Sequence, residues 1–379
     1  MAAGDLNLSE IKELIKARAF SLGFCLCGVT TNQPLENFCR YENWLKANYH
    51  GEMSYLASER HLSLRQDPIR LAPWVKSIIV FAWPYLLNRS TSTDLGGQIA
   101  GYAGDIDYHL LVPNKIHELL DDLPALFARP IQTQIFCDSS PLLERELAVR
   151  AGLGWIGRNS CVISPQHGSA FVLAELFLDK ELPADLPFTQ NLCGKCHTCL
   201  DACPTQCILA QREIDARHCI STLTIENKNL IPSPEIAHLE NHLFGCDICQ
   251  STCPWNQKVM AQSKALAQMD EAEMIAELTG NNIEFKSHFQ NSAIYRAKRR
   301  GWVRNLCAII SNLQLKNASE SLIQVFASDQ DAVCRASAAA ALASLDPSRS
   351  IPLIMARQKS ELDPLVLAKI EQIINENPL

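Results

Sequence analysis

The sequence predicts three domains: an α/β domain, a small cysteine-rich domain held together by metal centres, and an all-α domain of helical repeats. Three observations lead to this prediction. Strand-like apolar runs alternate with helical patterns up to about residue 180. Nine of the 16 cysteines then fall between residues 185 and 260, and the remaining chain has helical spacing throughout. We set the domain bounds at 1–182, 183–262 and 263–379.

Composition excludes some classes of protein. With 379 residues, of which 47% are hydrophobic and 20% charged, the chain can form more than one core. A net charge of −7 argues against general binding of polyanions over the whole surface. A nucleic-acid contact therefore needs a local basic patch. No apolar run is long enough to span a membrane, and residues 1–20 resemble an amphipathic helix and not a signal peptide. We therefore expect a cytoplasmic protein without membrane contact.

The first domain contains strands in short apolar runs and helices where apolar residues recur at helical spacing. The expected strands are 20–30, 74–85, 131–140 (a strand, then a turn), 160–164 and 169–178, and the expected helices are 1–20, 114–128 and 141–152. Ser140 and Pro141 suit the N-cap and the first position of the last helix.

Gly152, Gly154 and Gly157 form a G-x-G-x-x-G string, which is the spacing of dinucleotide-binding loops. In those loops a strand precedes the glycines and a helix follows them. Here a helix precedes and a strand follows, so the order argues against NAD or FAD. We expect a helix C-cap and a tight turn, with Gly154 and Gly157 allowing close backbone approach at the wall of a pocket.

Two cysteine runs indicate metal centres. The first has the C-x2-C-x2-C-x3-C-P spacing of bacterial ferredoxins, whose first three cysteines bind one 4Fe-4S cluster and whose fourth binds the other. The second matches the last three cysteines of this motif, and Leu243 occupies the position of the first. If the last cysteine of each run binds the cluster of the other run, two ligand sets follow. They are Cys193, Cys196, Cys199 and Cys253 for one cluster, and Cys203, Cys246 and Cys249 for the other.

One ligand of the second cluster stays open. Cys219 lies between the runs and is favoured, while Cys207 follows Cys203 too closely for easy geometry and is the alternative. Structural zinc is the alternative metal, but zinc explains neither the third closely spaced cysteine nor the two Cys-Pro steps. The seven other cysteines are expected to be small core residues: Cys25, Cys27, Cys39, Cys137, Cys161, Cys307 and Cys334.

The C-terminal region carries a weak repeat and a basic stretch. Similar helical segments begin at Val303, Val333 and Val366, which suits HEAT- or armadillo-like helix pairs, with an ordinary helical bundle as the alternative. The basic residues in 295–305 could bind RNA phosphates, and the rings of Tyr295 and Trp302 could stack on bases. The alternative is that the stretch is only the solvated face of a helix. Its candidate RNA contacts are Arg296, Lys298, Arg299, Arg300 and Arg304.

Asp138 ends the strand within 131–140. A carboxyl group there is a candidate proton donor if burial raises its pKa, or it simply caps the helix expected from Pro141.

These segments together resemble the epoxyqueuosine reductase family. The resemblance rests on residues 137–160, on both cysteine runs and on residues 292–305, in this order over most of the chain. It implies an N-terminal domain that binds cobalamin and two 4Fe-4S clusters that deliver electrons to it. The implied reaction removes the epoxide oxygen of epoxyqueuosine at the wobble position of tRNA, the last step of queuosine biosynthesis. It also implies an electron donor, which the sequence does not identify, and we expect a monomer.

The resemblance also assigns site residues. Asp138 matches the proton donor, and Cys219 matches the detached cluster ligand, in agreement with the spacing. The implied cobalamin contacts are Arg65, Ala100, Tyr102, Asp138, Val162, Leu173, Ser221, Cys246 and Asp247. The D-x-H-x-x-G cobalamin signature is absent, since the nearest string, 107–112, lacks the glycine. Cobalamin is therefore expected to bind without a protein histidine in that mode.

Two other functions remain as alternatives. A reductive dehalogenase-like enzyme would act on a small molecule and would not need the basic stretch. An electron-transfer module would contain iron without cobalt.

Overall fold

A computed structural model of the chain describes all residues except 1–5, 88–95, 128–129, 263–267 and 378–379. The chain forms two compact units, each of which is described by itself. Unit 1 comprises Met1–Leu87, Asp105–Ala216 and Asp247–Lys264. Unit 2 comprises Asn88–Gly104, Arg217–Cys246 and Ala265–Leu379. The predicted domain boundary at residue 263 and the predicted helix end at residue 128 lie outside the described residues.

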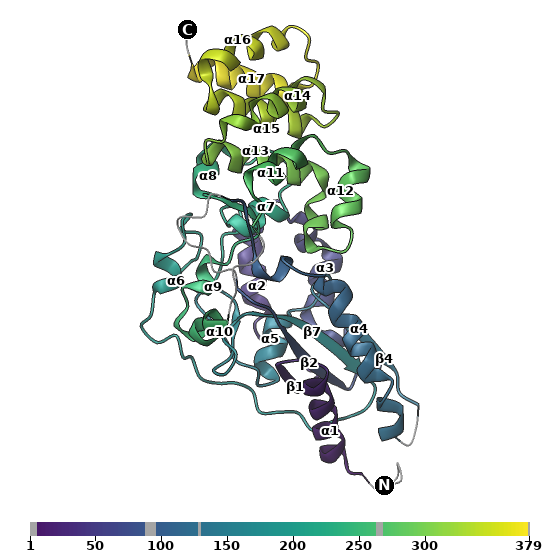
Figure 1. The fold of residues 1–379 in the computed structure, drawn as a ribbon. Coiled ribbons are helices and arrows are strands. Elements are labelled where there is room, and N and C mark those ends of the chain that lie inside the picture. The colour runs from purple at the N-terminus through teal and green to yellow at the C-terminus, as the bar shows by residue number, and fades with distance from the viewer. Residues whose placement is uncertain (1–5, 88–95, 128–129, 263–267, 378–379) are drawn as a thin grey trace. The chain divides into compact units, whose positions relative to one another are not determined.

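Unit 1 contains a four-stranded antiparallel sheet in the order β1-β2-β7-β4 (Figure 1). Its strands are β1 (Leu26–Thr31), β2 (Ser77–Pro84), β4 (Thr133–Phe136) and β7 (Phe171–Leu178). The strands predicted at 74–85 and 169–178 are confirmed as β2 and β7. The first strand begins later than predicted because helix α1 (Leu8–Ser21) extends to residue 21 and a turn through Gly23, which has φ +105°, follows it.

Helices cover both faces of this sheet. On one face, Ile15 of α1 and Ile116 of α4 (Tyr108–Leu120) belong to the same hydrophobic cluster as Ile79 of β2. On the other face, Leu147 of α5 (Glu144–Arg150) shares a cluster with Phe177 of β7. Since both faces are covered, side chains on the two central strands are removed from water whichever way they point.

The remaining elements of unit 1 are short. They are α2 (Phe38–Lys46), η1 (Ser54–Ala57), α3 (Glu59–Gln66), η2 (Pro68–Arg70), η4 (Leu123–Leu126), β5 (Trp155–Ile156), β6 (Val162–Ile163), α6 (Thr198–Asp201), α9 (Ile248–Ser251), η5 (Pro254–Asn256) and α10 (Gln257–Gln262).

The glycine string lies between α5 and the β5–β6 hairpin, in the order that the sequence predicts. Gly152 follows the helix with φ +80°, as a C-terminal capping glycine does. A Cβ atom on Gly154 would lie 2.0 Å from the carbonyl oxygen of Ile163, so only glycine allows the two backbones to approach this closely. The string is therefore a cap and a tight hairpin, and it does not open a helix.

Helix α5 begins later than predicted. Its first residue is Glu144, and Ser140 is not its N-cap, since the cap position is Leu143 with no side-chain hydrogen bond. The preceding residues form tight turns, in which the Ser139 amide donates to the Cys137 carbonyl and the Leu142 amide donates to the Ser140 carbonyl. These backbone hydrogen bonds close tight turns and keep residues 137–142 out of the helix. Asp138 consequently lies in a loop and does not cap α5.

Unit 2 is mostly helical and includes the two-stranded parallel sheet β3–β8. Its elements are β3 (Gln98–Ile99), η3 (Gly101–Ala103), α7 (Ile220–Ile225), α8 (Ser233–His238), β8 (His242–Phe244), α11 (Glu271–Thr279), α12 (Asn282–Phe289), η6 (Ala293–Ala297), α13 (Lys298–Asn312), η7 (Lys316–Ala318), α14 (Ser319–Ser328), α15 (Ala332–Leu345), α16 (Pro347–Gln358) and α17 (Pro364–Glu376).

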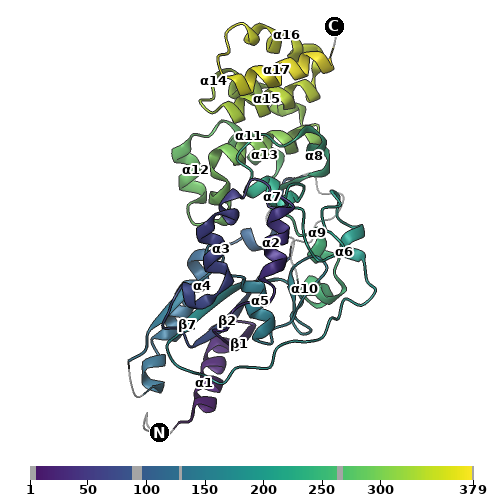
Figure 2. The same ribbon diagram turned by 180° about the vertical axis from the view of Figure 1, so that it is seen from behind.

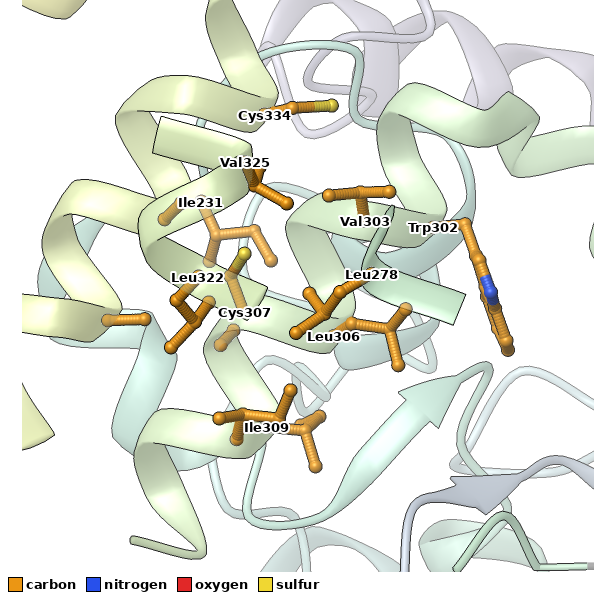
Figure 3. Packing of buried hydrophobic residues seen from close by; sticks show 14 of the residues in the cluster. Ile231, Leu278, Trp302, Val303, Leu306, Cys307, Ile309, Leu322, Val325 and Cys334 are labelled. Carbon is orange, nitrogen blue, oxygen red and sulfur yellow. The ribbon is translucent and has the colours of Figure 1, made fainter. Parts of the chain in front are cut away.

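The three predicted repeat segments fall on α13, α15 and α17, separated by α14 and α16 (Figures 1 and 2). Helix α15 packs against all four of these neighbours. Figure 3 shows the apolar side chains that fill this part of the core, among them Leu306, Cys307, Leu322 and Val325. The C-terminal region is therefore helical, as the sequence predicts. Among the residues that the structure describes, no helix has the length and apolar character to cross a membrane.

Candidate functional site

The Asp138 loop of unit 1 brings acidic, phenolic and imidazole groups together. Asp138 Oδ2 accepts a hydrogen bond of 3.0 Å from the Tyr108 hydroxyl and lies 3.2 Å from His109 Nε2. The other ring nitrogen of His109 lies 2.7 Å from Asp107 Oδ1. The three residues 107–109 begin helix α4, whose N-cap is Asp107. Two carboxyl groups therefore flank one imidazole, an arrangement that can store and pass a proton.

The electrostatics of this group favour a charged histidine. Burial lowers the pKa of His109, but the hydrogen bonds to Asp138 and Asp107 outweigh it, so the pKa is raised above its ordinary value. The Tyr108 and His109 rings stack with centroids 4.1 Å apart, which fixes the imidazole plane. The Asp138 side chain is 59% exposed, so its carboxyl group is accessible to a bound molecule.

Sequence reasoning identified Asp138 but missed Tyr108 and His109. In the sequence, residues 107–112 resemble only an incomplete D-x-H-x-x-G cobalamin signature. The available signal was an Asp-x-His spacing at a helix start, where an N-cap aspartate can also hold the imidazole of the second residue after it.

The four thiols predicted for the first cluster lie in one region of unit 1. Burial, together with the neighbouring thiols of Cys253 and Cys193, raises the pKa of Cys199 to about 11. Among the described residues, no three His, Cys, Asp or Glu side chains converge on a single metal ion. The thiols are thus close to one another without forming a one-ion site, and a four-iron cluster is larger than one ion.

Apolar residues and a tryptophan N–H lie beside two of these thiols, those of Cys193 and Cys253, whereas Cys196 is exposed. Trp155 Nε1 donates to Cys193 Sγ over 3.3 Å. Trp155 also packs edge-on against Trp255 and stacks on Phe188, and Cys253 lies in the same apolar cluster. Hydrogen bonds to sulfur and a water-poor surrounding are the features by which proteins adjust an iron–sulfur potential.

The second predicted ligand set is divided between the units. Cys203 and Cys249 belong to unit 1, whereas Cys219 and Cys246 belong to unit 2. In unit 1, Cys207 Sγ lies 3.6 Å from Cys203 Sγ, and the hydrogen bond from the Cys207 thiol lowers the pKa of Cys203 to about 5. A thiol with a lowered pKa is readily available as a thiolate ligand.

Most of the remaining cysteines are enclosed by the protein as predicted. Cys137, Cys307 and Cys334 are buried, and Cys25, Cys27 and Cys161 are partly buried. Cys39 is exposed, so the prediction that it is a core residue is wrong. It lies on α2, a nine-residue helix whose one buried residue is the preceding Phe38.

Four predicted cobalamin positions lie in unit 1 together with Asp138. Val162 is buried and Leu173 partly buried, both within the apolar layer that α5 covers. The Arg65 guanidinium donates to the Leu142 carbonyl and lies over the Tyr41 ring. Its buried Nε atom has no partner among the described residues. Asp247 is buried at the N-cap of α9.

The other four positions lie in unit 2 and gather around Gly245. A Cβ atom on Gly245 would lie 2.6 Å from Ala100 Cβ and 3.3 Å from the Tyr102 hydroxyl oxygen. The Gly245 amide N–H donates to the Thr224 hydroxyl of α7, the helix that carries Ser221, and Cys246 follows this glycine. The structure thus brings Ala100, Tyr102, Ser221 and Cys246 together at one end of the β3–β8 pair.

The basic stretch divides into exposed and enclosed residues. Arg296, Lys298 and Arg300 are exposed. Arg296 pairs with Glu226 over 3.1 Å, Arg300 pairs with Asp331 over 2.6 Å, and Lys298 lies over the Tyr295 ring. The Arg299 side chain is only 13% exposed and pairs with Asp329.

The predictions for Arg304 and Trp302 are wrong. Arg304 is 1% exposed and donates to the carbonyl groups of Leu223, Asn227 and Asn229. Its charge is used to satisfy backbone oxygens in the interior, so it cannot contact RNA. Trp302, labelled in Figure 3, is fully buried, and its ring lies 5.0 Å from that of Phe289, so it cannot stack on a base.

Two family models match this chain. A model described as "4Fe-4S double cluster binding domain" matches residues 192–256. A model described as "Epoxyqueuosine reductase QueG, DUF1730" matches residues 65–139, which include Arg65 and end one residue beyond Asp138.

Whole-chain comparisons agree with these models. The chain is 39% identical over 305 residues to the epoxyqueuosine reductase of Cyclobacterium marinum, covering 79% of this chain and 97% of the relative. It is 35% identical to that of Pseudomonas aeruginosa, covering 80% and 86%. A crystal structure of epoxyqueuosine reductase with an epoxyqueuosine-modified tRNA-Tyr stem loop matches with TM-score 0.88 at 26% identity, covering 97% of this chain and 99% of that one.

A structure from Bacillus subtilis matches with TM-score 0.86 at 26% identity, covering 97% of this chain and 99% of that one. That structure has an aspartate catalytic loop swung out of the active site.

The fold and the cysteine arrangement define a class of protein that joins a 4Fe-4S double cluster binding domain to a helix-covered sheet and a helical C-terminal region. Within this class the relatives point to one family. The chain belongs to the epoxyqueuosine reductase family.

Proposed function

We propose that this protein reduces epoxyqueuosine to queuosine at the wobble position of tRNA, the last step of queuosine biosynthesis. One observation carries the proposal: the chain matches, over 97% of its length, an epoxyqueuosine reductase whose structure contains an epoxyqueuosine-modified stem loop. The arrangement of Asp138 with Tyr108 and His109 supports the proposal chemically, because removal of an epoxide oxygen as water consumes protons as well as electrons. In the Bacillus subtilis structure an aspartate loop is the catalytic loop, which supports the role of the Asp138 loop here.

The proposed cofactors are two 4Fe-4S clusters and cobalamin. We assign Cys193, Cys196, Cys199 and Cys253 to one cluster and Cys203, Cys219, Cys246 and Cys249 to the other. The thiol-rich region with its Trp155 donor fits the first cluster. The unpartnered Nε of Arg65 fits a polar or anionic group of cobalamin. We propose the eight other predicted positions as further cobalamin contacts. Cobalamin, when bound, supplies a cobalt centre that passes the electrons to the epoxide-bearing ring.

The proposed role of Asp138 is to give a proton to the departing oxygen. The Tyr108 hydroxyl and the His109 imidazole hold the accepting oxygen in place and let the proton be replaced after each turnover. Asp107 fixes the tautomer of His109 by accepting from its other nitrogen.

We also infer the organisation of the chain. We propose a cobalamin-binding domain at 1–182, a ferredoxin-like domain at 183–262 and a HEAT-like domain at 263–379, and the succession of helices in unit 2 supports the last of these. We further propose a cytoplasmic monomer that receives its electrons from a donor not identified by the sequence.

The direct test is conversion of an epoxyqueuosine-containing tRNA stem loop by the purified protein, supplied with cobalamin and a chemical reductant, followed by mass spectrometry of the nucleosides. Queuosine formation that requires cobalamin is expected. A protein that contains iron but forms no queuosine with cobalamin present would contradict the proposal.

The activity should fall at alkaline pH because of His109. A histidine whose pKa is raised stays charged to higher pH than usual, and it loses its proton as the pH rises through that raised value. Neutral His109 can no longer supply a proton to Asp138, so kcat should decline there. His109→Gln should lower kcat and remove this alkaline limb, as measured in a kcat–pH profile. An unchanged profile in His109→Gln would exclude the role.

Lys298 and Arg300 are proposed to contact the tRNA backbone. Replacing both by Ala should weaken stem-loop binding several-fold and reduce the dependence of log Kd on log salt by about one for each lost contact. Fluorescence anisotropy at several salt concentrations measures both quantities. Arg349→Ala is the matched control, because Arg349 is exposed and paired with Glu320 over 2.6 Å, as Arg300 is with Asp331. Equal weakening in the control would mean that the stretch has no special role.

A further inference from the structure

A pair of glutamates lies behind the Asp138 loop. Glu175 projects from β7, where it pairs with Phe136 of β4 and Val80 of β2, and it is 0% exposed. Glu144 is the first residue of α5, and its carboxyl group interacts directly with that of Glu175. Both oxygens of Glu175 are buried without a hydrogen-bond partner among the N–H and hydroxyl groups of the described residues. A charged residue without a donor, at the centre of an apolar sheet, needs a physical reason.

A shared proton provides that reason. Two ionised carboxyl groups in contact would repel each other strongly away from water, so one of the pair holds a proton at neutral pH. Burial, then the charges of Glu144 and Asp138, raise the pKa of Glu175 well above its ordinary value. Burial and the charge of Asp138 raise the pKa of Glu144 to about 8, against the opposing effects of Asp138 N–H, Arg65 and the hydrogen bond with Glu175. Burial therefore favours the protonated, neutral form of Glu175.

Glu144 also makes a bond to the catalytic loop. Its Oε1 atom accepts a hydrogen bond of 2.7 Å from the backbone N–H of Asp138. Asp138 has φ +55°, in the left-handed region that residues with side chains rarely occupy. The Ser139 amide donates to the Cys137 carbonyl over 2.6 Å and closes a three-residue turn around it. A conformation of this kind persists only where the surroundings hold it, and Glu144 supplies one such bond.

We propose that Glu144 is a positioning residue for Asp138. Its carboxyl group accepts the backbone N–H of residue 138 and thereby directs the Asp138 side chain toward Tyr108 and His109. The bond goes to the backbone, so Asp138 keeps its side-chain oxygens for Tyr108, His109 and the substrate. The inference rests on the proposed role of Asp138 and extends it, because Glu144 acts on the reaction only through that residue.

The test replaces Glu144 in the full protein with its clusters and cobalamin. Glu144→Ala should speed hydrogen–deuterium exchange in the peptide 137–143 and lower kcat by about 10- to 100-fold, the effect of a misplaced catalytic group. The KM for the tRNA stem loop should change little. Glu144→Gln keeps an oxygen that accepts the Asp138 N–H and an amide that donates to Glu175, so it should recover slow exchange and most of kcat.

Glu146→Ala is the matched control. Glu146 lies on the same helix, is 7% exposed and also accepts a backbone N–H, that of Asn37 over 3.2 Å. Its removal should destabilise the protein to a similar extent without faster exchange in 137–143. If Glu146→Ala speeds exchange there as much as Glu144→Ala, the effect is general loosening of α5 and the proposal is overturned.

A second variant covers the case in which Glu144→Ala does not fold, since it strands Glu175 in the interior. Glu144→Leu with Glu175→Leu removes both polar groups together, which is far less costly than removing one. It should fold and show the same fast exchange and low kcat. Unchanged exchange or unchanged kcat in the folded variant overturns the proposal. Full activity in Asp138→Asn would instead show that Asp138 is not the proton donor. Hydrogen–deuterium exchange in peptide 137–143 would still decide whether Glu144 anchors the loop.

Discussion

Asp138→Ala is expected to abolish the reduction of epoxyqueuosine while cobalamin and the clusters stay bound. Asp138→Asn should lower kcat by about 10²- to 10⁴-fold, the usual contribution of a general acid. The amide can still accept from the Tyr108 hydroxyl, but it cannot release a proton to the departing oxygen. The side chain is 59% exposed in a loop, so its loss should leave the core of unit 1 unchanged.

Conversion of the modified stem loop, followed by mass spectrometry of the nucleosides, measures this effect. Iron content and the visible spectrum of bound cobalamin check that the variant is loaded. Asp122→Asn is the matched control, since its carboxylate is 56% exposed and pairs with Arg18 in the same unit. Wild-type turnover in a loaded Asp138→Ala protein would end the assignment of Asp138 as proton donor.

Cys253→Ser should remove one of the two clusters and with it nearly all activity. Iron should fall from about eight to about four atoms per chain, because each four-iron cluster needs its full set of cysteine ligands. Although Cys253 belongs to the second run in the sequence, the lost cluster should be the one that Cys193 also binds. Electron paramagnetic resonance of the reduced protein should therefore show the same residual signal in Cys253→Ser and Cys193→Ser.

Cys161→Ala is the control for this experiment. Cys161 lies near Cys253 but belongs to neither ligand set, so its removal should leave the iron content unchanged. Different residual signals in Cys253→Ser and Cys193→Ser would contradict the crossed arrangement. A protein that contains zinc and no iron would contradict the clusters themselves.

The regular parts of the fold could be predicted because their signals are local. Strands β2 and β7 are continuous apolar runs bounded by turns, and the C-terminal helices follow apolar residues at helical spacing. The order of the helix, the glycines and the hairpin excluded a dinucleotide loop, and the close approach of Gly154 to Ile163 agrees with that interpretation. Where α5 begins could not be predicted, because turns around Asp138 compete with the helix through hydrogen bonds.

The sequence by itself determined the family and the cysteine-rich double-cluster domain, because spacing within a short segment constrains which atoms can meet at one metal centre. Only the tertiary structure decided what each charged residue does. Arg304 follows Arg300 by four residues in the same basic stretch, yet the fold encloses it among carbonyl groups of residues 223–229. Likewise His109 reaches Asp138, and Glu175 reaches Glu144, across about 30 residues of chain. Burial and long-range contacts set the charge and partner of a side chain, and neither is encoded in its immediate neighbours.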